Sequence, residues 1–203
     1  IGTGTQGTTG AQGPTGTNIA WLEYYEPFKN VWNNGFGNYA TNTSFGDTAL
    51  SKVTNNAGGN TAIGYSAMYL ATIGFGNTAL GESALYKTSG SLNTAIGQRS
   101  LQLNIQGTGN VGIGGYSLYN TISGSYNTAL GYGAGTNATG SGNVYIGVNS
   151  GPTSSISPTI EDYKLYIASG QGTPLIGGDF AAQTVTITGE LRATGDVIAY
   201  YSS

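Results

Sequence analysis

The sequence predicts an all-β fold class: a trimeric parallel β-roll, or β-solenoid, of about seven repeats of 16–18 residues. Three observations lead to this prediction. An asparagine-led motif recurs through the middle of the chain, glycine occupies every third position near its start, and each repeat holds few large apolar residues. The expected boundaries are 1–17 for a collagen-like segment, 18–41 for an aromatic-rich cap or neck, 42–151 for the roll and 152–203 for a C-terminal intertwined β region.

Composition excludes several classes of function. Of 203 residues 36 are glycine, and charged residues make up 7% against 38% hydrophobic ones, which indicates an ordered chain with close backbone packing. The absence of histidine and cysteine excludes disulfides, thiolate or imidazole metal sites, and Ser-His-Asp or Cys-His catalysis. The net charge of -3 comes without a cationic stripe, and no run approaches the roughly 20 apolar residues of a membrane span. We therefore expect no nucleic-acid binding, no membrane insertion and no cofactor.

The first segment resembles collagen in its glycine spacing. Glycine occurs at positions 4, 7, 10, 13 and 16, as in a G-X-Y repeat, where only glycine fits at the axis of three chains. With only Pro14 to stiffen it, the alternative is a flexible Gly/Thr linker. A collagen-like reading fixes the number of chains at three. The chain starts at Ile1 rather than at methionine, so an N-terminal part is expected to precede it.

Residues 18–41 are rich in aromatic side chains without a clear period. We interpret this segment as a cap, because a bare terminal turn of a solenoid exposes both its core and a strand edge. A ligand-binding collar is the alternative. The aromatic residues are Trp21, Tyr24, Tyr25, Phe28, Trp32, Phe36 and Tyr39.

The repeat is a five-residue motif that starts with asparagine (position 1), has a large apolar residue at position 4 and ends with glycine at position 5. The asparagines are Asn42, Asn60, Asn77, Asn93, Asn110, Asn127 and Asn143. The apolar residues are Phe45, Ile63, Leu80, Ile96, Ile113, Leu130 and Ile146. The glycines are Gly46, Gly64, Gly81, Gly97, Gly114, Gly131 and Gly147. A second apolar anchor follows eight residues after each of the first five asparagines, at Leu50, Met68, Leu85, Leu101 and Leu118.

This pattern predicts a thin roll in which each repeat forms two short strands joined by two turns. We expect position 4 to form the inward-facing core, and the mostly small residues at position 3 to let the walls approach, with Tyr145 as the exception. The constant glycine indicates a corner with positive φ or close backbone approach. The asparagines are expected to hydrogen-bond up the stack. The sixth and seventh repeats carry Gly135 and Gly151 at the second anchor, so the roll is expected to change near its end.

One repeat offers only two large apolar side chains, too few to offset the entropy of ordering about 17 residues. Three rolls packed side by side would solve this problem. The core and the collagen-like start thus point to the same homotrimer.

The C-terminal region contains three strand-like runs, 163–168, 184–188 and 197–201, after a linker rich in serine and proline. The sequences at 177–179 and 188–190 are typical of turns. We expect an intertwined β end-piece rather than an independent domain.

The units NTAIGYSA (60–67) and NTALGYGAG (127–135) resemble the head repeats of trimeric autotransporter adhesins, and still more the longer repeats in fibre proteins of tailed phages and large viruses. The resemblance covers 42–151 and implies a left-handed parallel β-roll that trimerises side by side. The segment 164–203 resembles the region upstream of the self-cleaving intramolecular chaperone of phage tail fibres and tailspikes. That second resemblance implies that Ser203 is the C-terminus left by self-cleavage; the alternative is a boundary chosen by an experimenter.

Candidate chemical groups are few. Asp47 and Glu82 share one column two repeats apart, near the upper limit of carboxylate spacing for glycan hydrolysis, on an outer wall without an expected pocket. We interpret them, and the matching pair Lys52 and Lys87, as surface charges. The adjacent carboxylates at 161–162 are a weak signal for a divalent cation.

Exposed tyrosines are stronger candidates, because their flat faces and polar edges suit stacking on sugars. The candidate receptor contacts are Tyr65 and Tyr132 in one column, and Tyr200 and Tyr201 near the end. A further column, Tyr69, Tyr86 and Tyr119, is expected to pack between protomers.

Taken together, these features predict a structural and adhesive fibre of a phage tail, on the virion and outside the cell, that contacts a host-surface glycan or protein receptor. Its other partners would be upstream fibre or tail proteins, and no catalytic or metal site is expected. The alternatives are a tailspike-type glycan depolymerase and the head of a bacterial trimeric autotransporter adhesin.

Overall fold

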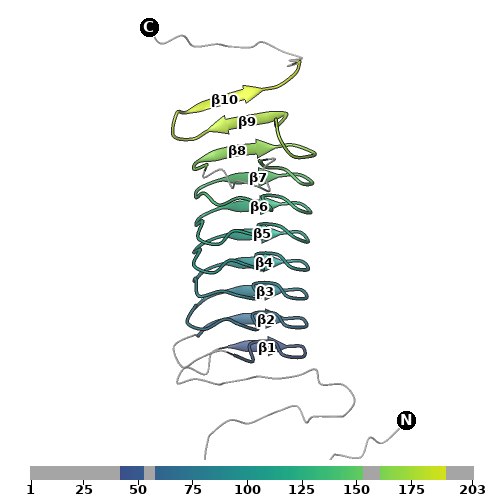
Figure 1. Cartoon of the computed structure of the whole chain (residues 1–203), viewed down its shortest axis with the longest axis vertical. Helices are drawn as coiled ribbons and strands as arrows, with labels where there is room; N and C mark the ends of the chain where they lie inside the picture. Colours follow the sequence, from purple (N-terminus) through teal and green to yellow (C-terminus); the bar gives the residue numbers. More distant parts are fainter. Residues whose placement is uncertain (1–41, 53–57, 153–160, 191–203) are drawn as a thin grey trace, which may run out of the picture.

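A computed structural model describes residues 42–52, 58–152 and 161–190. Within these ranges the chain is all-β, and ten strands form one sheet whose order follows the sequence (Figure 1). The strands of the successive turns are β1 Thr43–Phe45, β2 Thr61–Ile63, β3 Thr78–Leu80, β4 Thr94–Ile96, β5 Val111–Ile113, β6 Thr128–Leu130 and β7 Val144–Ile146. They are followed by β8 Lys164–Ile167, β9 Ile176–Asp179 and β10 Thr184–Ile187. The predicted β-solenoid of about seven turns is confirmed.

Strands β1 to β8 are parallel and in strict register. Position 2 pairs with position 2 of the next turn, as in Thr61 with Thr78, and the same holds for positions 3 and 4. The strand direction then alternates, because β8, β9 and β10 form an antiparallel meander at the C-terminal end of the sheet. The glycines at 177–178, predicted as a turn, instead lie inside β9.

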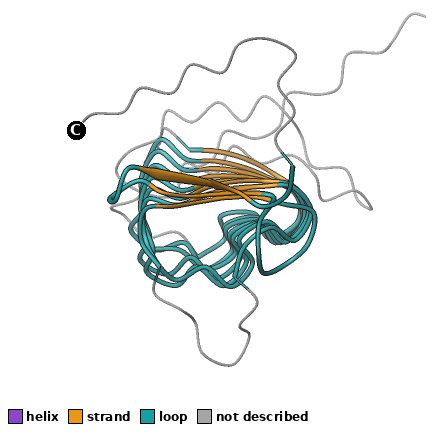
Figure 2. Cartoon of the chain, turned by 90° about the horizontal axis from the view of Figure 1, so that it is seen from above, coloured by secondary structure: helices purple, strands orange, loops and turns teal. Residues whose placement is uncertain are grey.

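Each turn, or rung, contains one strand and not the predicted two. Figure 2 shows the strands on one side of the roll and loops on the other. The loop wall cannot be a strand because positions 7 and 9 have positive φ, for example 54° at Ser66 and 52° at Met68. The two residues donate in opposite directions along the stack: the Ser66 N–H bonds to the Asp47 carbonyl of the previous rung at 2.9 Å, and that of Met68 to the Ala84 carbonyl of the next rung at 3.0 Å.

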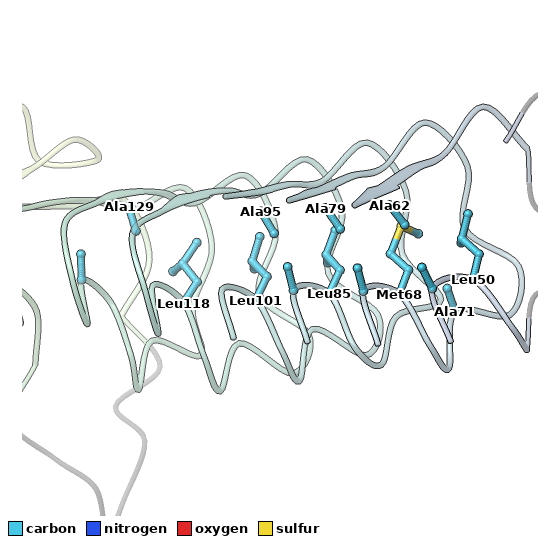
Figure 3. Close-up of a cluster of buried hydrophobic side chains, with 14 of the residues drawn as sticks. Leu50, Ala62, Met68, Ala71, Ala79, Leu85, Ala95, Leu101, Leu118 and Ala129 are labelled. Atoms are coloured by element: carbon cyan, nitrogen blue, oxygen red, sulfur yellow. The ribbon is translucent and has the colours of Figure 1, made fainter. Parts of the chain in front are cut away.

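The inward face of the strand is position 3, not position 4. Ala62, Ala79, Ala95 and Ala129 are completely buried, and they face the second-anchor residues across the roll (Figure 3). The anchors, from Leu50 to Leu118, are buried as predicted. A large residue on one wall therefore opposes a small one on the other.

The prediction that position 4 forms the roll's core is wrong. Neighbouring residues of a strand point to opposite faces, so a buried position 3 places position 4 outside. Ile96 is half-buried, and the other six residues are exposed by 36 to 50%: Phe45, Ile63, Leu80, Ile113, Leu130 and Ile146. The larger residue faces outward because the thin roll, already filled by the second-anchor residues, has room only for the smaller one.

The predicted asparagine ladder is confirmed, and it is buried. From Asn42 to Asn127, each side-chain oxygen accepts the backbone N–H of the next asparagine, as in Asn77 N–H to Asn60 Oδ1 at 2.9 Å and Asn93 N–H to Asn77 Oδ1 at 2.9 Å. Each side-chain nitrogen donates to a carbonyl of the following corner, as in Asn93 to Gly107 at 2.9 Å. The bond length is the same across rungs of 17 and 16 residues. The extra residue of a longer rung is therefore accommodated elsewhere in the loop wall.

The constant glycine fulfils both predicted requirements. Gly64 has a φ of +134°, and an added Cβ would lie 2.5 Å from the carbonyl oxygen of Gly81 in the next rung. The other six have φ between +111° and +137°. Glycine is the only amino acid that can adopt this positive φ and also allow so close a backbone approach, because it has no Cβ.

Near its end the roll changes as predicted, by an exchange of volume between its walls. Tyr145 takes position 3 and is 1% exposed. An added Cβ on Gly135 would lie 2.7 Å from the Tyr145 ring, and one on Gly151 would lie 3.3 Å from it. The aromatic ring thus occupies the space that leucine fills in earlier rungs.

Candidate functional site

One face of the sheet is apolar along its whole length. We call this the outer apolar face: the position 4 residues of β1 to β7, together with Leu165, Ile167, Ile176, Val185 and Ile187 of β8 to β10. The last five lie on one side because paired residues of neighbouring strands share a face and Tyr166, between Leu165 and Ile167, points inward. Val185 is 68% exposed.

Charge is absent from strands β1 to β7, whose other outward position is always threonine or valine. An extended apolar surface of this kind is unusual on a monomeric protein and marks an interaction site. The sequence carries a signal for this face, because position 4 is large and apolar in every repeat, but the motif alone does not show on which side of the strand that residue lies.

The two described tyrosines of the predicted receptor column are exposed but far apart. Tyr65 is 58% exposed and Tyr132 is 56% exposed. Three rungs lie between the rung of Tyr65 and the rung of Tyr132. Tyr132 packs edge-on against Tyr116, with ring centroids 5.7 Å apart, and the Arg99 guanidinium lies 5.7 Å from the centroid of the Tyr116 ring. The structure therefore provides a local aromatic cluster around Tyr116. Tyr200, Tyr201 and Ser203 lie outside the described residues.

The column predicted to pack between protomers makes contacts within the chain. Tyr69 and Tyr86 are half-buried and stack with centroids 5.5 Å apart, and Tyr119 lies 5.6 Å from Tyr116. These contacts order the rings along the loop wall.

The acidic candidates do not converge. Asp47 and Glu82 are both exposed, and Glu82 accepts a hydrogen bond from Gln98 at 2.8 Å. Glu161 accepts the hydroxyl of Tyr166, whereas Asp162 accepts the Ser141 N–H, so the adjacent carboxylates engage different partners. Lys52 and Lys87 are exposed as well.

A cavity of about 340 Å³ lies at the C-terminal meander, on the side opposite the outer apolar face. Its side chains come from the inward positions of β8 to β10, because Lys164 pairs with Asp179 and Asp179 with Thr184, while Tyr166 pairs with Gly177 and Gly177 with Thr186. Thr173, Pro174 and Thr188 complete the lining together with Leu165 and Gly178. At position 3 the inward side chains of β1 to β7 are mostly alanine, whereas those of β9 and β10 around this cavity are mostly polar.

Tyr166 separates this cavity from the core. Its ring stacks on that of Tyr145, with centroids 5.5 Å apart and planes inclined by 23°. Burial raises the pKa of both phenols well above their usual range; the Glu161 hydrogen bond raises that of Tyr166 further, and the neighbouring Tyr166, Glu161 and Asp162 raise that of Tyr145. Both rings are therefore neutral at any ordinary pH.

Lys164 and Asp179 form an ion pair at the mouth of the cavity, with a separation of 2.5 Å. The Lys164 hydrogen bond lowers the pKa of Asp179, with help from the Ala182 backbone. Each side chain is about 30% exposed, so water screens the pair.

Sequence reasoning missed both β9 and this cavity. One available signal was the run Lys164–Ile167, which repeats positions 1 to 4 with lysine in place of asparagine and extends the register by an eighth strand. The Lys164 N–H ends the asparagine ladder by donating to Asn143 Oδ1 at 2.8 Å.

Among the described ranges, no three His, Cys, Asp or Glu side chains gather as a possible metal site. The same part of the chain has no helix long and apolar enough to cross a membrane. Comparison of the chain with protein-family models, with curated proteins and with solved structures finds no match.

Proposed function

We propose that the chain is one protomer of a homotrimeric fibre in the tail of a phage, and that the fibre attaches the particle to a host cell surface. The observation that carries the proposal is the outer apolar face. It runs along ten strands, so it offers a partner of matching length a continuous surface rather than a local patch.

A second copy of the chain is the partner that fits best. The face repeats once per rung, and another roll of the same rung spacing would meet it with the same period. Leu80 at 44% and Leu130 at 50% exposure remain in water in the isolated chain, and their burial in an assembly would be favourable by roughly 25 cal/mol per Å².

Three copies are favoured over two by the glycine triplets at 4–16, which lie outside the described residues. A collagen-type helix requires three chains, and a roll joined to it would take the same three-fold symmetry. The predicted receptor contacts would then be presented three times, so avidity would exceed the affinity of one site.

Two measurements test the proposal. Mass measurement in native buffer should give three times 20.6 kDa, and a folded monomer would contradict the assembly. Adsorption of the purified trimer to host cells should decrease when Tyr65, Tyr132, Tyr200 and Tyr201 are changed to alanine. A trimer that adsorbs to no host surface would contradict the attachment role. The chain would then be only a structural shaft of the fibre.

A further inference from the structure

The inner side of the C-terminal meander has the properties of a small-molecule site. Its volume of about 340 Å³ lies within the range of about 300–1,000 Å³ that is typical of ligand pockets. It lies on a sheet face rather than on the free edge of β10, so a peptide strand added to that edge would not fill it.

Hydroxyl groups converge on the cavity from one strand. Thr184 and Thr186 alternate along β10 with Val185 and Ile187, which point to the outer apolar face, and Thr188 follows. The hydroxyls of these three threonines neither donate to nor accept from another group of the described residues, so they are able to donate to and accept from a ligand.

The apolar part of the lining is flat and local. Tyr166 contributes its ring, held in place from below by Tyr145, and Pro174 lies against the sheet where Gly177 lacks a side chain: an added Cβ there would lie 2.8 Å from Pro174 Cγ. Such a surface suits the C–H face of a sugar ring.

The charges around the cavity disfavour an anion. Lys164 is the single cation among residues 161–190, and Asp179 already neutralises it. The remaining charged residues of this range, Glu161, Asp162 and Glu190, are all acidic. A negatively charged sugar would meet repulsion, whereas an uncharged one would not.

We propose that this cavity binds a neutral saccharide unit through the Thr184 and Thr186 hydroxyls and the Tyr166 ring. The inference rests on the proposed attachment function and names the chemistry of one receptor contact. It adds a site apart from the tyrosines at 65, 132, 200 and 201.

The test is saturation-transfer NMR on the full chain, with the methyl glycosides of glucose, galactose, mannose and N-acetylglucosamine as neutral probes. Glucuronate and N-acetylneuraminate serve as acidic probes. We expect at least one neutral probe to bind and both acidic probes to bind more weakly. The double substitution Thr184→Val with Thr186→Val keeps side-chain volume and should weaken binding roughly tenfold.

Thr108→Val is the matched control, because it makes the same change at a half-buried threonine of the loop wall, away from the meander and from the outer apolar face, and should leave saccharide affinity unchanged. Three outcomes would overturn the inference: no neutral probe binds, the double variant binds as tightly as the parent, or an acidic probe binds best. A trimer that adsorbs to cells but binds no saccharide would overturn this inference alone. Saccharide binding without adsorption would support the site and contradict the attachment role.

Discussion

The ring of Tyr145 lies within contact distance of the space above Gly135, where an added Cβ would come 2.7 Å from it. The two residues belong to neighbouring rungs and to opposite walls of the roll. Together they replace the alanine and leucine that fill the same volume in earlier rungs, such as Ala79 and Leu85. The core therefore keeps its width while the large residue changes sides.

This exchange predicts a rescue. Tyr145→Ala removes a buried ring and its stack on Tyr166, and we expect a loss of about 3–5 kcal/mol in the free energy of unfolding. Gly135→Leu alone should also destabilise the roll, because the new side chain meets Tyr145 and Leu118. The double variant restores the earlier pattern and should recover much of the loss, since Gly135 has φ +62° and Leu118 adopts +50° at the equivalent position.

Chemical denaturation of the four proteins measures the effect as a double-mutant cycle. Tyr132→Ala, at a 56% exposed side chain, is the control and should cost far less. Additive losses in the double variant would show that the two positions do not share one volume.

The buried asparagine ladder predicts that loss of one of its side chains destabilises the roll. Asn93→Ala leaves the Asn110 N–H without its acceptor at 2.9 Å, and it removes one of two amide donors from the Gly107 carbonyl, which keeps the Asn104 side chain at 3.0 Å. Because these groups are buried, we expect a loss of about 2–4 kcal/mol in the free energy of unfolding. Asn137→Ala, which removes only a half-buried side-chain contact to Asn120, should cost less than about 1 kcal/mol. Equal thermal shifts for the two variants would argue against the ladder as a stabilising element.

The outer apolar face predicts separate effects on assembly and on folding. Ile113→Asp places a charge in the middle of the proposed interface and should dissociate the trimer, because burying an unpaired charge costs several kcal/mol per chain. Ile122→Asp is the matched control, at a residue that is 50% exposed but lies outside the sheet. Analytical ultracentrifugation should find monomers for the first variant and trimers for the second. Trimers in both cases would place the interface elsewhere.

The stacked phenols predict sensitivity to alkali. Burial raises the pKa of Tyr145 and Tyr166 above the value of about 10 in the unfolded chain. Their contribution to stability is therefore complete below about pH 10 and is lost as the pH rises toward the higher pKa of the folded state. Melting temperatures measured from neutral pH into alkali should fall above about pH 10. Replacing both tyrosines by phenylalanine should flatten that fall, and an unchanged slope would point to other groups.

The repeat made the solenoid predictable, because its period, asparagines and glycines each specify a backbone feature that recurs in every rung. The sidedness of the strand was not predictable from apolarity alone. In Thr78-Ala79-Leu80 the choice between burying Ala79 or Leu80 depends on the volume of Leu85 across the roll, which the motif does not encode.

The candidate sites show a similar division. Exposure of Tyr65 and Tyr132 followed from their column, whereas the cavity depends on the fold of the meander. Gly177 and Gly178 are typical of a turn, but they lie in β9, where Pro174 leaves no room for a side chain at Gly177: an added Cβ would lie 2.8 Å from Pro174 Cγ.

The asparagine ladder has the same geometry across rungs of different length, so each repeat adds the same rise to the roll. Asn77 and Asn93 accept the same contact from the next asparagine although their rungs differ by one residue. Each rung contacts only its neighbours, so duplication or loss of one of the repeats with alanine at position 3 and an apolar second anchor would leave the ladder contacts of the others in place. The length of the roll could therefore change in steps of one rung, about 4.8 Å each.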